Sequence, residues 1–156
     1  MSIRDEVFAR SERESEKYLY VGKSHYRNNS DIPIGKGLFS GICLKKNDPI
    51  CTFLGEERPP KEYDERVQRG LGGYAHHLTN YTIIDCFNFR TINKYKASMT
   101  NASRGLFHIV SGRAATNNSD IRVDTRRRLV RLVATVDIPP NTEIITSYGG
   151  AYNLRF

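Results

Sequence analysis

Short apolar runs separated by turn residues recur along most of this chain, and this pattern predicts a domain built mainly from β-strands. Gly, Pro, Asn and Asp bound the runs, as is typical of strands joined by tight connections. The predicted strands cover residues 18–21, 42–44, 50–54, 74–78, 81–85, 122–124, 129–136 and 144–148. From residue 129 onward both faces of the strand carry apolar side chains, so we expect that strand to be central in its sheet.

Helical signals are few. Pro59 and Pro60 precede the charged segment 61–68, which Gly70 ends, and this arrangement predicts one short helix. Residues 1–17 are dominated by Arg, Glu and Ser, and we interpret them as a charged arm or a solvated helix. The remaining residues, 18–156, are expected to form one domain, because a chain of 156 residues favours a single core.

Two further features of the pattern concern the architecture. Residues 87–120 are dense in Asn, Ser, Gly and Arg, which predicts an irregular connection of a kind that is usually functional or disordered. Residues 42–55 and 133–149 echo one another, because in each segment two apolar runs flank a proline turn and lead to an aromatic residue and a glycine.

The composition indicates a globular intracellular protein. No apolar run approaches the roughly 18 residues of a membrane span, and the charged start of the chain lacks the apolar core of a signal peptide. The formal net charge of +7 suits acidic partners, including nucleic acid, without specifying one. Cys43, Cys51 and Cys86 are scattered, which argues against both a disulfide framework and a zinc site.

Several kinds of catalytic site find no support in the sequence. His76 and His77 are neighbours on a predicted strand, so their side chains point to opposite faces and cannot share a metal ion. Gly35 and Gly37 lack the third glycine and the helix of a dinucleotide-binding site. No nucleophile-elbow motif is present. We therefore expect neither a metal nor a nucleophilic triad.

The order of five motifs is more informative than any one of them. They are Gly35-Lys36-Gly37-Leu38-Phe39, Phe53-Leu54-Gly55-Glu56, Tyr81-Thr82-Ile83-Ile84-Asp85, an Asn-rich loop, and Glu143-Ile144-Ile145-Thr146-Ser147-Tyr148-Gly149. This order resembles the SET-domain protein lysine methyltransferases over residues 18–152, in a compact form without flanking cysteine-rich zinc segments. The resemblance implies a mainly β, β-clip-like SET fold of short strands, with a knot-like C-terminal segment and few short helices.

The resemblance also implies a binding site for S-adenosylmethionine. Ala102 stands where the family has the histidine of its Asn-His-Ser motif, and Asn117-Asn118 resembles the Pro-Asn that closes this motif. Residues 36–38 look like the family's backbone wall around the cofactor. The implied cofactor contacts are Lys36, Gly37, Leu38, Asn101, Ala102, Tyr148 and Tyr152.

Tyr148 matches the family's catalytic tyrosine. The channel implied for the substrate lysine is lined by Phe53, Tyr74, Thr146 and Tyr148. Aromatic walls guide the apolar stem of a lysine and attract its ammonium group by cation–π interaction. Thr146 is smaller than the Phe or Tyr that the family often has there, so the sequence predicts room for di- or trimethylation.

The implied reaction is S-adenosylmethionine-dependent methylation of the ε-amino group of a protein lysine, without a metal. A histone tail or nucleosome is one substrate class, and it would place the protein in the nucleus. Two alternatives stay open. Ala102, together with Phe53 in place of a tyrosine, is compatible with a catalytically inactive SET-like protein-binding module. Residues 126–131, rich in Arg, are compatible with a basic nucleic-acid-binding β domain.

Overall fold

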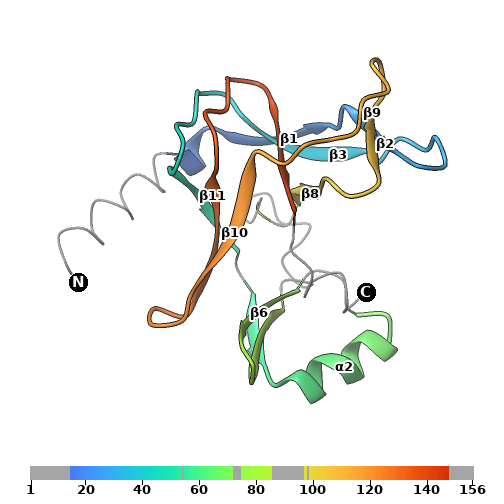
Figure 1. Cartoon of the computed structure of the whole chain (residues 1–156). Helices are drawn as coiled ribbons and strands as arrows, with labels where there is room; N and C mark the ends of the chain where they lie inside the picture. The colour runs from blue at the N-terminus through green and yellow to red at the C-terminus, as the bar shows by residue number, and fades with distance from the viewer. Residues whose placement is uncertain (1–14, 54, 72–74, 86–96, 98, 148–156) are drawn as a thin grey trace.

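The computed structural model describes residues 15–53, 55–71, 75–85, 97 and 99–147 of the chain. Their regular structure consists mainly of short strands, which form three sheets accompanied by helix α2, Pro60–Gln68 (Figure 1). No helix among them is long and apolar enough to cross a membrane.

The largest sheet has seven strands, in the order β1-β3-β12-β10-β11-β4 with β8 beside β12. Its strands are β1 Leu19–Lys23, β3 Lys36–Ser40, β4 Pro49–Thr52, β8 Asn101–Ala102, β10 Ser119–Asp124, β11 Leu129–Ala134 and β12 Glu143–Thr146. A two-stranded sheet pairs β2 Tyr26–Asn28 with β9 Leu106–His108. A three-stranded sheet has the order β5 Glu56–Arg58, β7 Thr82–Asp85, β6 Ala75–Thr79.

Strand β12 lies inside the large sheet and is buried along its whole length. It runs antiparallel to β3, where Glu143 opposes Phe39 and Ile144 opposes Leu38. It runs parallel to both β8 and β10. A late segment of the chain is therefore inserted between strands that come earlier in the sequence. The knot-like C-terminal segment that the family resemblance implies extends beyond the described residues and stays a prediction.

The echo between residues 42–55 and 133–149 corresponds to a real pairing. Leu44 and Ile138 form an isolated antiparallel bridge, and their backbones exchange hydrogen bonds of 2.9 and 2.7 Å. The two similar segments therefore contact each other directly.

The turns that follow this bridge hold the two halves together in matching ways. The Asn47 N–H donates to the Ala134 carbonyl at 2.8 Å, and the Asn141 N–H donates to the Ser40 carbonyl at 2.7 Å. Both asparagines have a positive φ, 74° and 61°, which Asn tolerates better than most residues. The turn at Asn47 thus binds the end of β11 and leads into β4, and the turn at Asn141 binds the end of β3 and leads into β12.

The main hydrophobic core joins the large sheet to the three-stranded sheet. Leu38, Leu132 and Ile144 have no exposed surface, and they share one cluster with Leu78 and Ile84 of the smaller sheet. The smaller sheet is therefore packed onto the main domain through its own apolar face.

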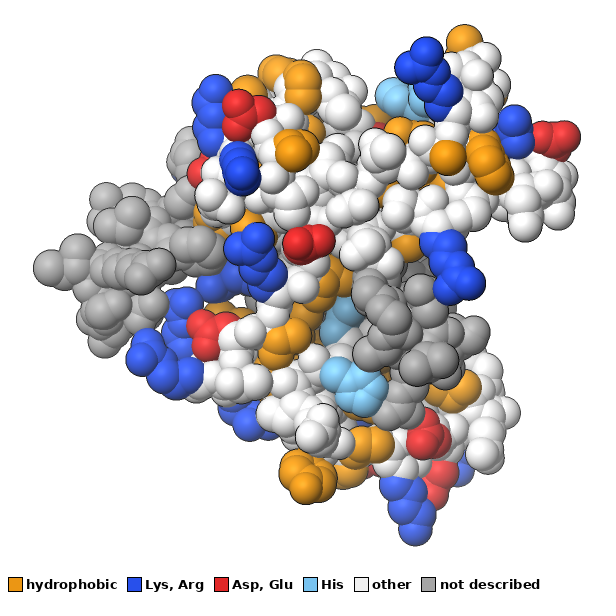
Figure 2. Space-filling model, viewed as in Figure 1, with side chains coloured by type: hydrophobic (Ala, Val, Ile, Leu, Met, Phe, Trp, Pro, Cys, Tyr) orange, Lys and Arg blue, Asp and Glu red, His pale blue; other side chains and the backbone are white. Residues whose placement is uncertain are grey.

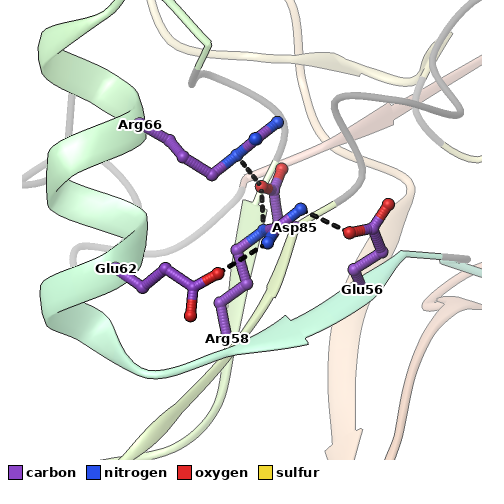
Figure 3. A network of polar contacts seen from close by, with 5 residues as sticks. All are labelled: Glu56, Arg58, Glu62, Arg66 and Asp85. Atoms are coloured by element: carbon purple, nitrogen blue, oxygen red, sulfur yellow. Dashed lines mark hydrogen bonds and ion pairs between the residues drawn. The ribbon is translucent and has the colours of Figure 1, made fainter.

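A polar network fixes α2 against the three-stranded sheet (Figure 3). Asp85 is only 2% exposed and accepts hydrogen bonds from Arg58 Nε at 2.8 Å and Arg66 Nε at 3.0 Å. Arg58 also bonds to Glu62 of the helix and to Glu56 of β5. One buried carboxylate thus links a strand to the helix through two guanidinium groups.

Much of the predicted secondary structure is confirmed. Helix α2 begins at Pro60 and ends at Gln68, and β6 and β7 form the predicted hairpin around residues 79–80. Strand β11 lies between β10 and β4, as its two apolar faces require. Residues 15–17 of the predicted arm are helical, and residues 1–14 lie outside the described part.

Two expectations are wrong. Residues 42–44 are not a strand, because the Ser40 hydroxyl donates to the Ile42 carbonyl and accepts from the Ile42 N–H, which bends the chain after β3. Within the segment 87–120, the described residues are not wholly irregular, since β8, β9 and the start of β10 lie there. The first two of these strands have only two and three residues, too few to show a periodic pattern.

Candidate functional site

The predicted cofactor wall, residues 36–38, forms the start of strand β3. Lys36 is exposed, whereas Leu38 has no exposed surface and packs its side chain in the main core. Gly35, just before the strand, has a φ of 89°, and a Cβ placed there would meet no atom within 4 Å. The residue directly before the wall is thus a glycine beside open space, which allows close approach of a ligand to the backbone.

Strand β8 brings Asn101 and Ala102 to the end of β12. Asn101 pairs with Ile145 and Ala102 pairs with Thr146 in parallel register. The Ser103 N–H continues this pairing with a hydrogen bond of 2.8 Å to the Thr146 carbonyl. The structure therefore brings together two predicted cofactor residues and a predicted channel residue. Thr146 stands two residues before the predicted catalytic tyrosine in the sequence.

The side chain of Asn101 connects β8 to the wall. Its Nδ2 donates to the Lys36 carbonyl at 2.9 Å and to Glu143 Oε2 at 3.0 Å. An amide nitrogen carries two hydrogens, so these contacts use both. Asn101 can therefore bind a ligand only through its backbone or its side-chain oxygen.

Glu143 is a buried carboxylate behind this wall, with 3% of its surface exposed. The Ser24 hydroxyl lies 2.9 and 3.0 Å from its two oxygens, and the His25 N–H donates to Oε1 at 2.9 Å. Burial, and secondly the Glu143 charge, raises the pKa of the nearby Tyr26 hydroxyl.

Sequence reasoning included Glu143 in a motif without giving it a role, and it missed Ser24 and His25 altogether. A signal for Glu143 existed, because a charged residue at the start of an apolar strand needs hydrogen-bond partners once the strand is buried. Nothing in the sequence indicates which residues those partners are.

Asn118 holds β12 from the side of β10. Its N–H donates to the Ile145 carbonyl, and its Oδ1 accepts from the Ile145 N–H, both at 2.9 Å. Its Nδ2 donates to the Glu143 carbonyl at 3.0 Å, and the Ser119 hydroxyl donates to the Ile145 carbonyl at 2.9 Å. Asn118, which resembles the closing Asn of the family motif, thus hydrogen-bonds to the backbone of β12 as a neighbouring strand would.

Phe53 and Thr146, the described residues of the predicted channel, are both buried. The Phe53 ring lies 4.2 Å from the ring of His76, whose pKa burial lowers to about 3, so this histidine is neutral near pH 7. Thr146 has no exposed surface, and among the described residues its Oγ1 is one of the buried polar atoms without a hydrogen-bond partner.

Three predicted site residues, Tyr74, Tyr148 and Tyr152, lie outside the described residues, so their roles stay predictions. The last described residue is Ser147, which is exposed and follows the end of β12. Among the described residues no group of His, Cys, Asp or Glu could hold a metal ion.

On the face shown in Figure 2, several Lys and Arg side chains lie at the lower left, where Figure 1 places the tip of the β10–β11 hairpin, and others occur singly or beside Asp and Glu. At the tip of the β10–β11 hairpin, Arg127 pairs with Asp124, whose carboxyl pKa it lowers, and Arg128 pairs with Glu57. Two arginines of the predicted nucleic-acid segment are therefore already bound to carboxylates of this chain.

Comparisons with known proteins bear on this geometry. A family model described as the SET domain matches residues 35–149. Among solved structures, two of a humanized mutant of the Chaetomium thermophilum Polycomb Repressive Complex 2, one bound to the inhibitor GSK343 and one to GSK126, are similar in fold. The first is 18% identical with a TM-score of 0.62, and the second is 19% identical with a TM-score of 0.61.

Each of these matches covers 84% of this chain but 15% of the solved chain, so this chain spans a small part of those proteins' length. No curated protein sequence matches the chain. The mainly β, SET-like fold predicted from the sequence is confirmed.

Proposed function

Since this chain belongs to the SET-domain family, we propose that it methylates the ε-amino group of a protein lysine with S-adenosylmethionine as the methyl donor. The observation that carries the proposal is the meeting of β3, β8 and β12, three segments distant in sequence, at Lys36, Asn101 and Glu143. Strand β12, which contributes Glu143, ends at Thr146, two residues before Tyr148 in the sequence.

The residues around the start of β3 fit this cofactor. Gly35 offers backbone next to open space, and Asn101 fixes the Lys36 carbonyl at 2.9 Å. We assign cofactor binding to Lys36, Gly37, Leu38, Asn101, Ala102, Tyr148 and Tyr152. Bound S-adenosylmethionine would supply a methyl group on its sulfonium; the lysine nitrogen would bond to that methyl carbon in line while the carbon–sulfur bond breaks and S-adenosylhomocysteine leaves as a neutral thioether.

Alignment is the main task of the protein in such a displacement. Correct placement of two reactants contributes about 7–11 kcal/mol in favourable cases. The backbone of β12 is hydrogen-bonded to both Asn118 and Ser103, so the residues that lead to Tyr148 start from a fixed position.

The target lysine has to lose a proton before it can react. With an ordinary pKa of about 10.4, only about one lysine in a thousand is neutral near pH 7.4, which costs about 4 kcal/mol. Burial of the amine in an apolar channel favours the neutral form. We assign this channel to Phe53, Tyr74, Thr146 and Tyr148.

Tyr148 is proposed to orient the neutral amine through its hydroxyl group and to stabilise the partial charge on the methyl group during transfer. A phenol with a pKa of about 10 is mostly protonated near pH 7, so we assign it this role rather than that of a general base.

Histone tails are the substrate class that the family resemblance favours, and a histone substrate would place the protein in the nucleus. The similar solved structures are parts of a complex, which supports protein partners for this chain as well. Both assignments are proposals, because the match covers a small part of those proteins.

A radiolabelled methyl-transfer assay on histones, nucleosomes and a cell extract tests the function. The wild-type protein is expected to label a protein lysine, and Tyr148→Phe is expected to lose most of this activity while it still binds S-adenosylmethionine in calorimetry. Methyl transfer by Tyr148→Phe at the wild-type rate would refute the role of this tyrosine. Mass spectrometry of the product is expected to show di- or trimethyl-lysine, because Thr146 is small.

One observation favours a second candidate. Ala102, next to Thr146 in the parallel pairing of β8 and β12, replaces the histidine of the family motif, as an inactive SET-like binding module allows. Calorimetry separates the two candidates, since the enzyme binds S-adenosylmethionine and the inactive module does not. Steeply salt-dependent DNA binding without cofactor affinity would instead favour the nucleic-acid-binding alternative.

A further inference from the structure

Glu143 lies where β3, β8 and β12 meet, behind the candidate cofactor wall, and no cofactor, substrate or catalytic role is assigned to it above. We propose that Glu143 is a positioning residue: its buried carboxylate holds the backbone of Gly35 and Lys36 in the conformation that binds S-adenosylmethionine. This inference rests on the proposed function and deepens it.

The first observation is the fit between Glu143 and Gly37. A Cβ built at Gly37 would lie 2.4 Å from Glu143 Oε2 and 2.7 Å from its Cδ, distances at which atoms overlap. The open space lies elsewhere, at Gly35, where an added Cβ meets nothing within 4 Å. Gly37, within the wall, therefore makes room for the carboxylate, and Gly35, just before the wall, lies beside open space that a ligand can reach.

The second observation is the set of groups that surround the carboxylate. The hydroxyl of Ser24, the N–H of His25 and the Nδ2 of Asn101 all donate to it, at 2.9–3.0 Å. Both carboxylate oxygens therefore serve as acceptors in these contacts. A buried charge is costly unless it is hydrogen-bonded in this way, and hydrogen bonds to a charged group are stronger than neutral ones.

The third observation is that two of these donors also hold the wall. Asn101 Nδ2 donates to the Lys36 carbonyl at 2.9 Å as well as to Glu143. The Ser24 N–H donates to the Gly35 carbonyl at 2.8 Å, while its hydroxyl binds Glu143. Glu143 thus fixes the orientation of Ser24 and Asn101, and these two residues fix consecutive peptide carbonyls of the wall.

Glu143→Gln tests this role, because glutamine has the same shape but one oxygen becomes an amide nitrogen that cannot accept. The variant is expected to bind S-adenosylmethionine about 10-fold to 100-fold more weakly, the loss typical of one hydrogen bond to a charged group. The KM for the protein substrate is expected to change less than about threefold, because no contact of Glu143 reaches the channel side in the described structure. Glu62→Gln, which neutralises a half-exposed carboxylate on α2, is the matched control and is expected to bind the cofactor as the wild type does.

Amide hydrogen exchange without cofactor gives a readout that does not depend on activity. In Glu143→Gln the N–H groups of Ser24 and His25 are expected to exchange faster, while those of β10 and β11 keep wild-type protection. Unchanged cofactor affinity in this variant, or faster exchange throughout the protein, would overturn the positioning role. A wild-type protein that binds no S-adenosylmethionine would refute the proposed function and this role together, and the exchange data would then show whether the carboxylate still orders the wall.

A double-mutant cycle covers the case in which Glu143→Gln does not fold. Gly37→Ala is expected to lower the melting temperature by itself, and Glu143→Ala is expected to reduce that effect by removing the atoms that overlap with the new methyl group. Additive effects would show that Gly37 and Glu143 do not share this space and would overturn the inference.

Discussion

The ring of His76 lies against the ring of Phe53, with centroids 4.2 Å apart and planes inclined by 52°. His76 belongs to β6 of the three-stranded sheet, whereas Phe53 directly follows β4 of the large sheet. The contact therefore lies where the two sheets join. It places a titratable ring inside the core, next to a residue of the proposed lysine channel.

This burial predicts a loss of stability in mild acid. The pKa of His76 is about 3 in the folded protein because burial disfavours the charged ring, against about 6.5 in an unfolded chain. The unfolded state therefore binds more protons between these pH values, so stability is full above pH 6.5 and falls as the pH decreases toward 3. Wild-type protein is expected to lose about 2 kcal/mol more than His76→Gln between pH 7 and pH 5, measured by urea unfolding. Equal losses for the two proteins would contradict this.

The elements that the sequence predicts correctly are those with local signals. Helix α2 starts at a proline pair and ends before Gly70, and the β6–β7 hairpin alternates around a polar turn. Strand β3 has no such signal, because Gly37 interrupts its pattern and both faces are buried. Strand β8 has two residues and exists only through its pairing with β12, which lies more than forty residues further along the chain.

The residues of the candidate site also differ in whether the sequence predicts them. Family motifs identify Lys36, Asn101 and Thr146, and the structure brings these residues to neighbouring strands. The buried contact between Ser24 and Glu143 joins positions 119 residues apart, and neither residue has a local pattern that predicts the other. Such contacts follow from the packing of the whole sheet, so a single sequence does not contain a readable signal for them.

The ion pairs of Asp85 are expected to stabilise the three-stranded sheet and helix α2. Its carboxylate is 2% exposed and binds both Arg58 and Arg66, so Asp85→Asn leaves two partly buried guanidinium groups without their shared charge (Figure 3). The free energy of unfolding is expected to fall by about 3 kcal/mol, as when one partner of a buried ion pair is removed. Urea unfolding measures this. Glu62→Gln, which removes a half-exposed partner of Arg58, is the control and is expected to cost less than about 1 kcal/mol.

The hydrogen bonds from the Asn118 side chain to β12 are expected to contribute to the stability of the protein. In Asn118→Asp an oxygen replaces the Nδ2 that donates to the Glu143 carbonyl, so two oxygens face each other and a hydrogen bond is lost. The expected decrease in the free energy of unfolding is about 2–3 kcal/mol. Asn117→Asp adds the same charge at the exposed neighbouring position and is expected to change stability by less than about 0.5 kcal/mol. Similar effects of the two substitutions would show that the added charge, rather than the lost contact, is responsible.

Replacing Thr146 by valine is expected to stabilise the protein. Its Oγ1 is buried without a hydrogen-bond partner in the described structure, so Thr146→Val replaces an unsatisfied hydroxyl by a methyl group of similar size. The free energy of unfolding is expected to rise by about 1 kcal/mol in urea titrations, because a buried hydroxyl without a partner costs about 1–3 kcal/mol. Ser119→Ala is the matched control, since the Ser119 hydroxyl donates to the Ile145 carbonyl at 2.9 Å and its removal is expected to lower the same free energy by about 1 kcal/mol. If Thr146→Val raises the free energy of unfolding and Ser119→Ala lowers it, the Thr146 hydroxyl is unsatisfied and the Ser119 hydroxyl is satisfied. A lower free energy of unfolding in both variants would show that the Thr146 hydroxyl has a partner in solution.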